Sequence, residues 1–259
     1  MLKNRHTLFF CLSLSLFPFY CNATENNDFI ENFQNKFDEQ VSEAMDISTE
    51  EQIRLLKLAN KQLNQNNIQI TQTQLGIIVD RGISQQTISI VLMSPDINDW
   101  QFIGQTHVST GKPGRKEHFK TPTGVFKIDG SILGYRALGT FNENHIRGNG
   151  IKGMRVWDFG WQTTEDWRTK GATMDIRMEM HATDPANLAK RFGRPDSEGC
   201  IRIPGDLNKF IDQYGILDKN VEYKAITSKS SKALLGGNHQ ETGFSGEFLI
   251  IVDGDKNDD

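Results

Sequence analysis

The sequence predicts a mostly β domain with a few helices and an N-terminal helical extension. Between residues 68 and 228, short segments rich in β-branched and apolar residues recur, separated by turns that contain glycine or proline. These segments do not alternate with long helical patterns, as the strands of a doubly wound sheet do. Residues 24–67, by contrast, are polar, contain no glycine or proline, and carry apolar residues at helical spacing.

The N-terminal residues 1–23 have the features of a secretory signal peptide. Lys3 and Arg5 precede a twelve-residue apolar run, Leu8–Phe19, and Cys21-Asn22-Ala23 gives a small-residue cleavage pattern. The run is shorter than the roughly 20 residues that span a bilayer, and no later stretch approaches that length. We therefore expect an exported protein of the periplasm or cell envelope, without stable membrane insertion.

The extension, residues 24–67, is predicted to contain two helical segments. Ser48 and Glu51 have the spacing of a capping box, with Ser48 as the N-cap. The apolar positions that define the two helical faces are Phe29, Phe33 and Phe37 in the first segment and Ile53, Leu56, Ala59 and Leu63 in the second. We expect both helices to pack on the domain that follows. The alternative is an arm that binds a partner.

Strands follow in the order of the chain, with helical patterns near the end of the domain. The predicted strands are Leu75–Asp80, Thr87–Met93, Trp100–Thr110, Val125–Asp129, Met154–Phe159, Ile176–Met180, Val221–Ile226 and Phe248–Val252. Helices are predicted at Pro185–Phe192 and Leu207–Tyr214. Residues 229–259 are expected to add one strand and an acidic tail to the domain at residues 68–228.

The charge balance argues against a nucleic-acid partner. The formal net charge of the 259 residues is −4, and it becomes −6 without residues 1–23, which carry two basic and no acidic side chains. A basic stripe, which nucleic acid requires, does not dominate any segment. The remaining 236 residues suit one large domain with an appendage.

Cys200 would be the one cysteine left after removal of residues 1–23, because Cys11 and Cys21 lie in that segment. A lone thiol cannot close an internal disulfide, and oxidising compartments disfavour idle exposed thiols. The neighbours of Cys200 are Ser, Glu, Gly, Ile and Arg, which are poor company for a buried small hydrophobe. With His181 upstream, Cys200 is predicted to be an activated nucleophile.

Four ordered motifs carry a family resemblance. They are Val108-Ser109-Thr110-Gly111, Thr121-Pro122-Thr123-Gly124, a strand that ends in His181, and Ser197-x-Gly199-Cys200-Ile201-Arg202. Together they resemble the L,D-transpeptidase catalytic domain, or YkuD domain, from about Leu75 to Ile226. The resemblance implies a β-sandwich or mixed-sheet fold and an enzyme that acts on peptidoglycan stem peptides, with no cofactor. It also implies cross-linking through a cysteine thioester, and for some members a wall-tethered lipoprotein as acceptor.

The resemblance assigns roles to individual residues. Cys200 is the nucleophile and His181 the base, while the backbone N–H groups of Gly199 and Cys200 are candidates for the oxyanion hole. Ser197 and Arg202 beside the nucleophile are candidate substrate contacts, with Ser197 expected to act mainly through hydrogen bonds within the loop. Further candidates lie in the glycine- and aromatic-rich segment 130–173, namely Tyr135, Arg136, His145, Arg147, Trp157, Trp161 and Trp167. For the tryptophans, packing in the core is the competing interpretation.

The chain departs from the family pattern at two positions. Glu198 stands where members often have a second histidine, and Ala182 stands where a glycine often follows the catalytic histidine. A carboxylate beside the nucleophile opposes thiolate formation unless it pairs with a cation. We expect Glu198 to pair with a nearby arginine such as Arg202, Arg194 or Arg191.

Other chemistries fit the sequence less well. The scattered ligand candidates His107, His118, His145, His181 and Asp184 form neither an HExxH motif nor part of a CxxC pair, so no metal is expected. A papain-like protease would place its cysteine before its histidine, the reverse of the order here. Hydrolysis by an L,D-carboxypeptidase or endopeptidase and a catalytically silent wall-binding module remain alternatives.

Overall fold

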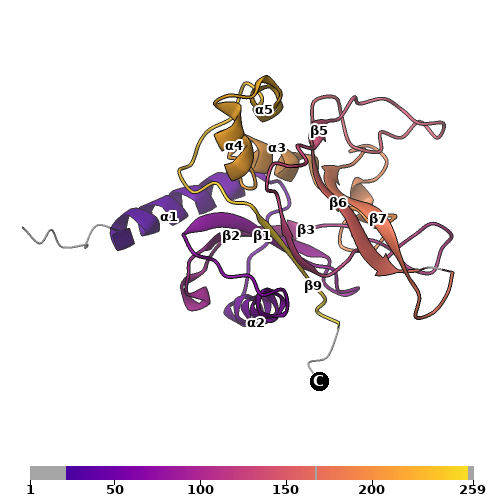
Figure 1. Cartoon of the computed structure of the whole chain (residues 1–259), viewed down its shortest axis with the longest axis horizontal. Coiled ribbons are helices and arrows are strands. Elements are labelled where there is room, and N and C mark those ends of the chain that lie inside the picture. The colour runs from indigo at the N-terminus through magenta and orange to yellow at the C-terminus, as the bar shows by residue number, and fades with distance from the viewer. Residues whose placement is uncertain (1–21, 167, 256–259) are drawn as a thin grey trace, which may run out of the picture.

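The computed structural model describes residues 22–166 and 168–255. The predicted signal peptide lies outside the described residues except for Asn22 and Ala23, and Trp167 and the end of the acidic tail also lie outside them. Within these ranges the chain forms two sheets, with two helices before them and three after the catalytic motifs (Figure 1). This architecture confirms the predicted combination of β-sheets, a few helices and an N-terminal helical extension.

The first sheet has five strands in the order β3-β2-β1-β9-β4. Their bounds are Gln74–Asp80 for β1, Thr87–Met93 for β2, Gln101–His107 for β3, Gly124–Lys127 for β4 and Phe248–Val252 for β9. Strand β9 pairs parallel with β1 and antiparallel with β4, so the C-terminal segment supplies an interior strand. The first sheet is therefore complete only when β9, from the C-terminal segment, has paired with β1 and β4.

Both faces of this sheet are covered, which explains why every residue of β1, β2 and β9 is buried. One face, with Ile77 and Leu249, belongs to the main core, and the other, with Ile78 and Ile250, packs under helix α2. Strands buried on both faces are read as continuous apolar runs rather than as alternating ones. In Figure 1, α2 lies on one side of β1, β2 and β9, and α3 to α5 lie on the other.

The second sheet has the order β5-β6-β7-β8 and carries the candidate site. Its strands are Tyr135–Arg136 (β5), Arg155–Glu165 (β6), Thr173–Ala182 (β7) and Ile201–Ile203 (β8). Strands β6 and β7 are longer than predicted, and β5 and β8 were not predicted. The inner face contributes Met178 and Met180 of β7 and Ile201 and Ile203 of β8 to the main core. Because side chains alternate along a strand, the residues between these four face away from the core.

The N-terminal helices α1 (Asn22–Gln40) and α2 (Thr49–Gln65) pack on the domain, as expected. Phe33 and Phe37 of α1 each contact the ring of Phe210, with centroids 5.3 Å apart. The Ser48 side chain accepts a hydrogen bond from the backbone N–H of Glu51, which confirms the predicted N-cap. The buried face of α2 is Leu55, Ala59 and Leu63, whereas Ile53 is exposed, so the predicted face was shifted at its N-terminal end.

The helices after the nucleophile motif include two differences from the prediction. Helix α3 (Gly205–Gln213) confirms the helix predicted at Leu207–Tyr214, and α5 (Lys229–Leu235) was not predicted. Residues Val221–Ile226 form part of helix α4 (Lys219–Ala225) and not a strand, because only Val221 of this segment turns into the core. Of the helix predicted at Pro185–Phe192 only a short 3-10 turn, Ala189–Arg191, forms. Another short 3-10 turn, Ile97–Asp99, lies between β2 and β3.

Candidate active site

The pairing of β7 with β8 brings the candidate base and nucleophile to one face of the sheet. The two strands are parallel, and His181 is the register partner of Arg202. Cys200 precedes Arg202 by two positions and Glu179 precedes His181 by two. Since side chains two apart on a strand share a face, all four point away from the core. Cys200 follows His181 by 19 positions in the sequence, and the parallel pairing of β7 with β8 brings the two residues to the same face.

His181 is held as a neutral base. Its side chain is 5% exposed, and Nδ1 lies 2.7 Å from the carbonyl oxygen of Ala182. A carbonyl oxygen only accepts, so this contact places the proton on Nδ1 and leaves Nε2 with a free lone pair. Burial, helped by the charge of Arg202 and opposed by the contact to Ala182, lowers the pKa of His181 to about 4. Ala182, where the family often has glycine, supplies this contact through its backbone, so the substitution leaves it intact.

Cys200 is held as a neutral thiol in the unliganded protein. Burial raises its pKa to about 11; the backbone N–H of Glu179 and the charge of Arg202 act in the opposite direction. The carboxylates of Glu179 and Glu198 raise the pKa as well. Sγ lies 3.9 Å from the carbonyl oxygen of Arg177. Cys200 and His181 are therefore both neutral in the resting state of the protein.

Ser197 shapes the nucleophile loop from inside. It is fully buried, and its hydroxyl donates to the carbonyl oxygen of Cys200 and accepts from the N–H of Gly199 at 3.1 Å. Ser197 is therefore not free to contact a substrate, because its hydroxyl is bound within the loop, as expected from the sequence. The Gly199 N–H is engaged in the same way. For the oxyanion hole this leaves the N–H of Cys200, which makes no hydrogen bond within the described part of the chain.

The Val108–Gly111 motif packs against this loop and forms backbone hydrogen bonds with it. The backbone of Ser109 pairs with that of Arg202, and the carbonyl oxygen of Thr110 accepts from the N–H of Ser197 at 3.0 Å. A Cβ added to Gly111 would lie 1.9 Å from the carbonyl oxygen of Phe119, so only glycine fits there. The motif's glycine is thus required by close backbone packing under the nucleophile.

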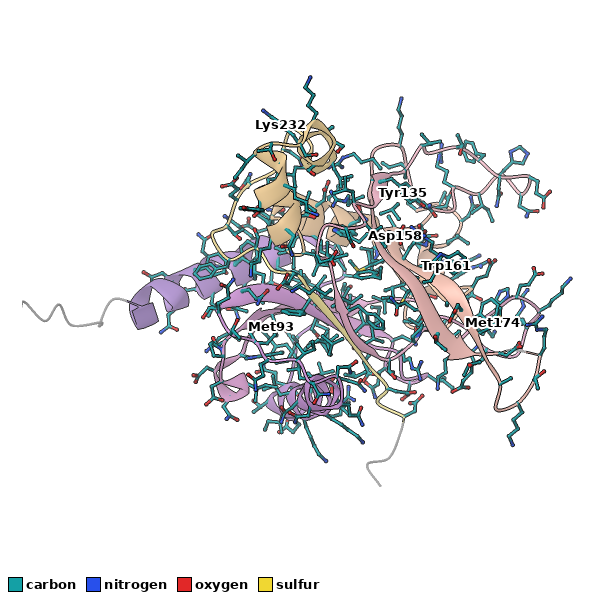
Figure 2. All side chains as sticks on the ribbon, in the orientation of Figure 1. Met93, Tyr135, Asp158, Trp161, Met174 and Lys232 are labelled. Carbon is teal, nitrogen blue, oxygen red and sulfur yellow. The ribbon has the colours of Figure 1, made fainter. Side chains whose placement is uncertain are left out.

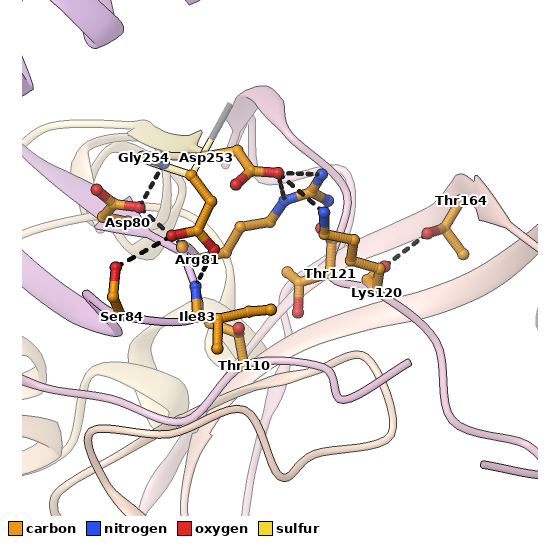
Figure 3. Close-up of polar contacts among 12 residues, drawn as sticks. Asp80, Arg81, Ile83, Ser84, Thr110, Lys120, Thr121, Thr164, Asp253 and Gly254 are labelled. Atoms are coloured by element: carbon orange, nitrogen blue, oxygen red, sulfur yellow. Dashed lines mark hydrogen bonds and ion pairs between the residues drawn. The ribbon is translucent and has the colours of Figure 1, made fainter. Parts of the chain in front are cut away.

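The Thr121–Gly124 motif fastens the loop from the other side. The Thr121 hydroxyl donates to the carbonyl oxygen of Gly199 and accepts from the N–H of Gly111, both at 2.8 Å. The Thr121 carbonyl in turn accepts from Arg81, whose guanidinium pairs with Asp253 at 2.9 Å (Figure 3). Asp253 directly follows β9 in sequence. The chain end and the nucleophile loop are therefore joined through buried polar contacts.

The aromatic candidates divide between the outer face and the core. Tyr135 and Trp161 lie on the outer face of β5 and β6, where Trp161 is 66% exposed (Figure 2). The Tyr135 hydroxyl reaches Glu179 at 3.3 Å, and burial together with the charges of Glu179 and Cys200 raises the pKa of Tyr135 to about 12. Trp157, in contrast, is 1% exposed within the main core, so the core interpretation was the correct one.

Arg136 also turns away from the site. Its guanidinium pairs with Asp212 of α3 at 2.8 Å and donates to the carbonyl oxygens of Gly153 and Leu234. These contacts fasten the helices to the second sheet, and they occupy the side chain that the sequence suggested for substrate. Arg202 differs, because its charge acts on both Cys200 and His181.

Glu198 does not form the expected ion pair. Its side chain is exposed and makes no ion pair or hydrogen bond to another described residue. Arg191 pairs with Asp196 at 2.9 Å, and Arg202 donates to the carbonyl oxygen of Asp196 at 3.0 Å. Asp196 thus takes these arginine contacts, while the charge of Glu198 acts on Arg202 without a salt bridge. The unpaired Glu198 charge is one of the contributions that raise the pKa of Cys200.

A pocket of about 310 Å³ opens beside Tyr135. It is lined by residues of the segments 135–142 and 146–150, among them Phe141 and Asn149. Arg147 holds this loop in place. Its guanidinium lies 3.8 Å from the centre of the Phe141 ring, and its backbone N–H donates to the Asp184 carboxylate at 3.0 Å. Asn149 donates to the Tyr135 hydroxyl at 2.9 Å, which links the pocket wall to the group that contacts Glu179.

The sequence reasoning missed Glu179, which lies nearer to the centre of the site than several residues it selected. The alternation along β7 contained the signal, because a residue two positions before His181 must share its face. Asp158 and Arg177 were missed as well. They form an ion pair of 2.6 Å on the same outer face, next to Trp161, the register partner of Arg177.

A comparison with known protein families finds a match that spans most of these strands, loops and motifs. The model of the L,D-transpeptidase catalytic domain, YkuD, matches residues 76–219, which is more than half of the chain. The chain belongs to this family. The predicted resemblance is therefore confirmed, and β9 of the first sheet follows the matched region in sequence. No curated protein matches the chain significantly.

Two further findings concern the described residues. None of their helices is both long and apolar enough to cross a membrane. Their histidine, cysteine and carboxylate side chains do not gather in groups of three or more that could hold a metal ion.

Proposed function

We propose that this protein is an exported peptidoglycan L,D-transpeptidase that cross-links stem peptides through a thioester on Cys200. One observation carries the proposal: parallel strands β7 and β8 bring Cys200 and a neutral His181 to the same face, with Nδ1 of His181 held by the Ala182 carbonyl. Membership of the L,D-transpeptidase family supports the acyl-transfer chemistry and stem peptides as substrates. No cofactor is needed for these steps.

In the acylation step, His181 accepts the thiol proton at Nε2 while Sγ attacks the carbonyl carbon of the donor peptide bond. A thiol with a pKa of about 11 is almost entirely protonated at neutral pH, so this transfer has to accompany the attack. The imidazolium then returns the proton to the leaving amine, which is released. The donor acyl group remains on Sγ as a thioester.

The Cys200 N–H is the donor proposed for the oxyanion that forms in both steps. One such donor typically contributes about 2.7–4 kcal/mol to the stability of the transition state. In the second step an acceptor amine attacks the thioester, its proton passes to His181, and the thiol is regenerated. The charge of Arg202 favours the thiolate and disfavours the imidazolium, so its two effects on this ion pair oppose each other.

The acyl donor is proposed to lie on the outer face of the second sheet. Trp161 offers an exposed ring there, and the pocket beside Tyr135 gives a second contact surface. Stem peptides of the wall are the proposed partners, with a wall-tethered lipoprotein as a further acceptor. Export by residues 1–23 would bring the enzyme to them in the periplasm or cell envelope.

The test is mass spectrometry of muropeptides after incubation of purified protein with sacculi that contain tetrapeptide stems. We expect new cross-linked dimers and loss of the terminal residue from donor stems, both absent with Cys200→Ala. Shortened stems without dimers would instead identify an L,D-carboxypeptidase, and cleaved cross-links an endopeptidase. Unchanged muropeptides, from a protein whose Cys200 is not acylated, would indicate a silent wall-binding module.

A further inference from the structure

Glu179 faces the candidate nucleophile from the neighbouring strand. The β7–β8 register, continued from the His181–Arg202 pair, sets Glu179 opposite Cys200, with both side chains on the outer face. The side chain of Glu179 is half-buried, so solvent screens its charge only in part. Its backbone N–H and its carboxylate both act on the thiol. Glu179 is therefore part of the reaction centre, although the proposed chemistry gives it no role.

The carboxylate of Glu179 forms no salt bridge with another described residue, although the charge of Arg177 acts on it. Its one hydrogen bond comes from the neutral Tyr135 hydroxyl on β5, at 3.3 Å. Arg177, two positions earlier on β7, is the nearest candidate, but its guanidinium is bound to Asp158 of β6 by two hydrogen bonds. Burial, and after it the charge of Asp158, raise the pKa of Glu179, whereas the Tyr135 hydrogen bond and the charge of Arg177 lower it in part.

The remaining charged groups around the thiol come from β8 and the loop before it. Arg202 on β8 donates to the carbonyl oxygen of Asp196, and Glu198 in the loop is exposed without a partner. His181 on β7 is neutral. A carboxylate that is only partly compensated thus faces a thiol whose ionisation it opposes, an arrangement that a bound cation would reverse.

We propose that Glu179 binds a primary ammonium group of the peptide substrate, and that this ion pair readies Cys200 for attack. The inference rests on the proposed function, since it assumes that a peptide lies over Cys200. An ammonium group fits better than a metal ion, because the described residues offer no cluster of three ligands there. Glu179 and the lone pair of the Tyr135 hydroxyl that Asn149 does not use give such a group two acceptors at the edge of the 310 Å³ pocket.

Two sources could supply this ammonium group: a side chain of the acyl donor or the acceptor amine. The experiment separates them with three probes in amine-free buffer. N-acetyl-L-Ala-γ-D-Glu-L-Lys carries a donor-side ammonium, its norleucine counterpart lacks it, and ethylamine stands for an acceptor. For each probe, the rate of Cys200 alkylation by iodoacetamide is followed against pH. The inflection gives the thiol pKa independently of any shielding, which changes only the limiting rate.

We expect the lysine peptide or ethylamine to lower the inflection by about one pH unit, equal to about tenfold more thiolate below the inflection. The norleucine peptide should leave it unchanged. In Glu179→Gln the inflection should already be low without a probe, and no probe should lower it further. An effect of the lysine peptide assigns the donor as the source, and an effect of ethylamine alone assigns the acceptor.

Glu198→Gln is the matched control, since it removes a second carboxylate that acts on the same thiol. This variant should keep the response to the ammonium probe. The proposal is overturned if neither ammonium probe shifts the wild-type inflection, or if Glu179→Gln responds as the wild type does. Cross-linking by a wild-type protein that ignores both probes would reject the role of Glu179 and leave the proposed function standing. Failure of all thiol-dependent activity would reject the function itself.

Discussion

Replacing Thr121 by valine tests whether the buried hydroxyl fastens the nucleophile loop. The change keeps the shape of the side chain but removes the oxygen that joins the Gly111 N–H to the Gly199 carbonyl. Both backbone groups belong to buried residues, and each unsatisfied group costs about 1–3 kcal/mol. We therefore expect the free energy of unfolding to fall by about 2–6 kcal/mol, a large part of the 5–15 kcal/mol typical of a domain.

Urea denaturation followed by circular dichroism measures this loss as a lower midpoint with an unchanged slope. Thr121→Ser keeps the hydroxyl and should lose only about 1 kcal/mol, for the missing methyl group. Thr163→Val is the exposed control: it removes a hydroxyl that bonds Asp175 at the surface and should change stability by less than about 1 kcal/mol. Equal losses in Thr121→Val and Thr121→Ser would refute the reasoning.

Three further predictions concern other parts of the structure. A chain that ends at residue 247 lacks β9, which joins β4 to β1 in the first sheet, so circular dichroism should show no cooperative unfolding; a cooperative transition would show that the sheet forms without it. Alkylation of Cys200 should keep accelerating up to about pH 11, since its pKa is raised to about 11, and a plateau near pH 7 would instead indicate a preformed thiolate–imidazolium pair. Trp157→Ala should lower the free energy of unfolding by about 3–5 kcal/mol because it empties a core site. Trp161→Ala should leave the unfolding midpoint unchanged and raise KM for stem peptides, and the opposite pattern would exchange the roles of the two rings.

Local sequence patterns were sufficient to predict much of the fold. The strands at Leu75–Asp80 and Thr87–Met93 form with the predicted bounds or within one residue of them, because long apolar β-branched runs suit strands buried on both faces. Ser48 caps α2 through a contact three residues away. The segment Val221–Ile226 failed for the same local reason, since its β-branched ends resemble a strand while tertiary packing holds it in α4.

For the site, the motifs predicted which residues lie near the nucleophile but not how they face. Ser197 and Arg136 look like substrate contacts in sequence, yet one is buried inside the loop and the other is bound to Asp212. Their orientation depends on strand register and, for Arg136, on Asp212 and Leu234, which lie 76 and 98 residues away and which no local pattern encodes. Glu179 was missed because it belongs to no motif: alternation along β7 places it on the face of His181, and the pairing of β7 with β8 then sets it opposite Cys200.

The central claim is that Cys200 carries the donor acyl group. The most direct measurement is rapid acid quenching of the protein with a tetrapeptide muropeptide, followed by digestion and mass spectrometry of the peptide that contains Cys200. The account predicts an added mass equal to the donor without its terminal residue, attached to Cys200 and absent in Cys200→Ala, which folds normally but forms no cross-links. Cross-link formation by Cys200→Ala would contradict the account.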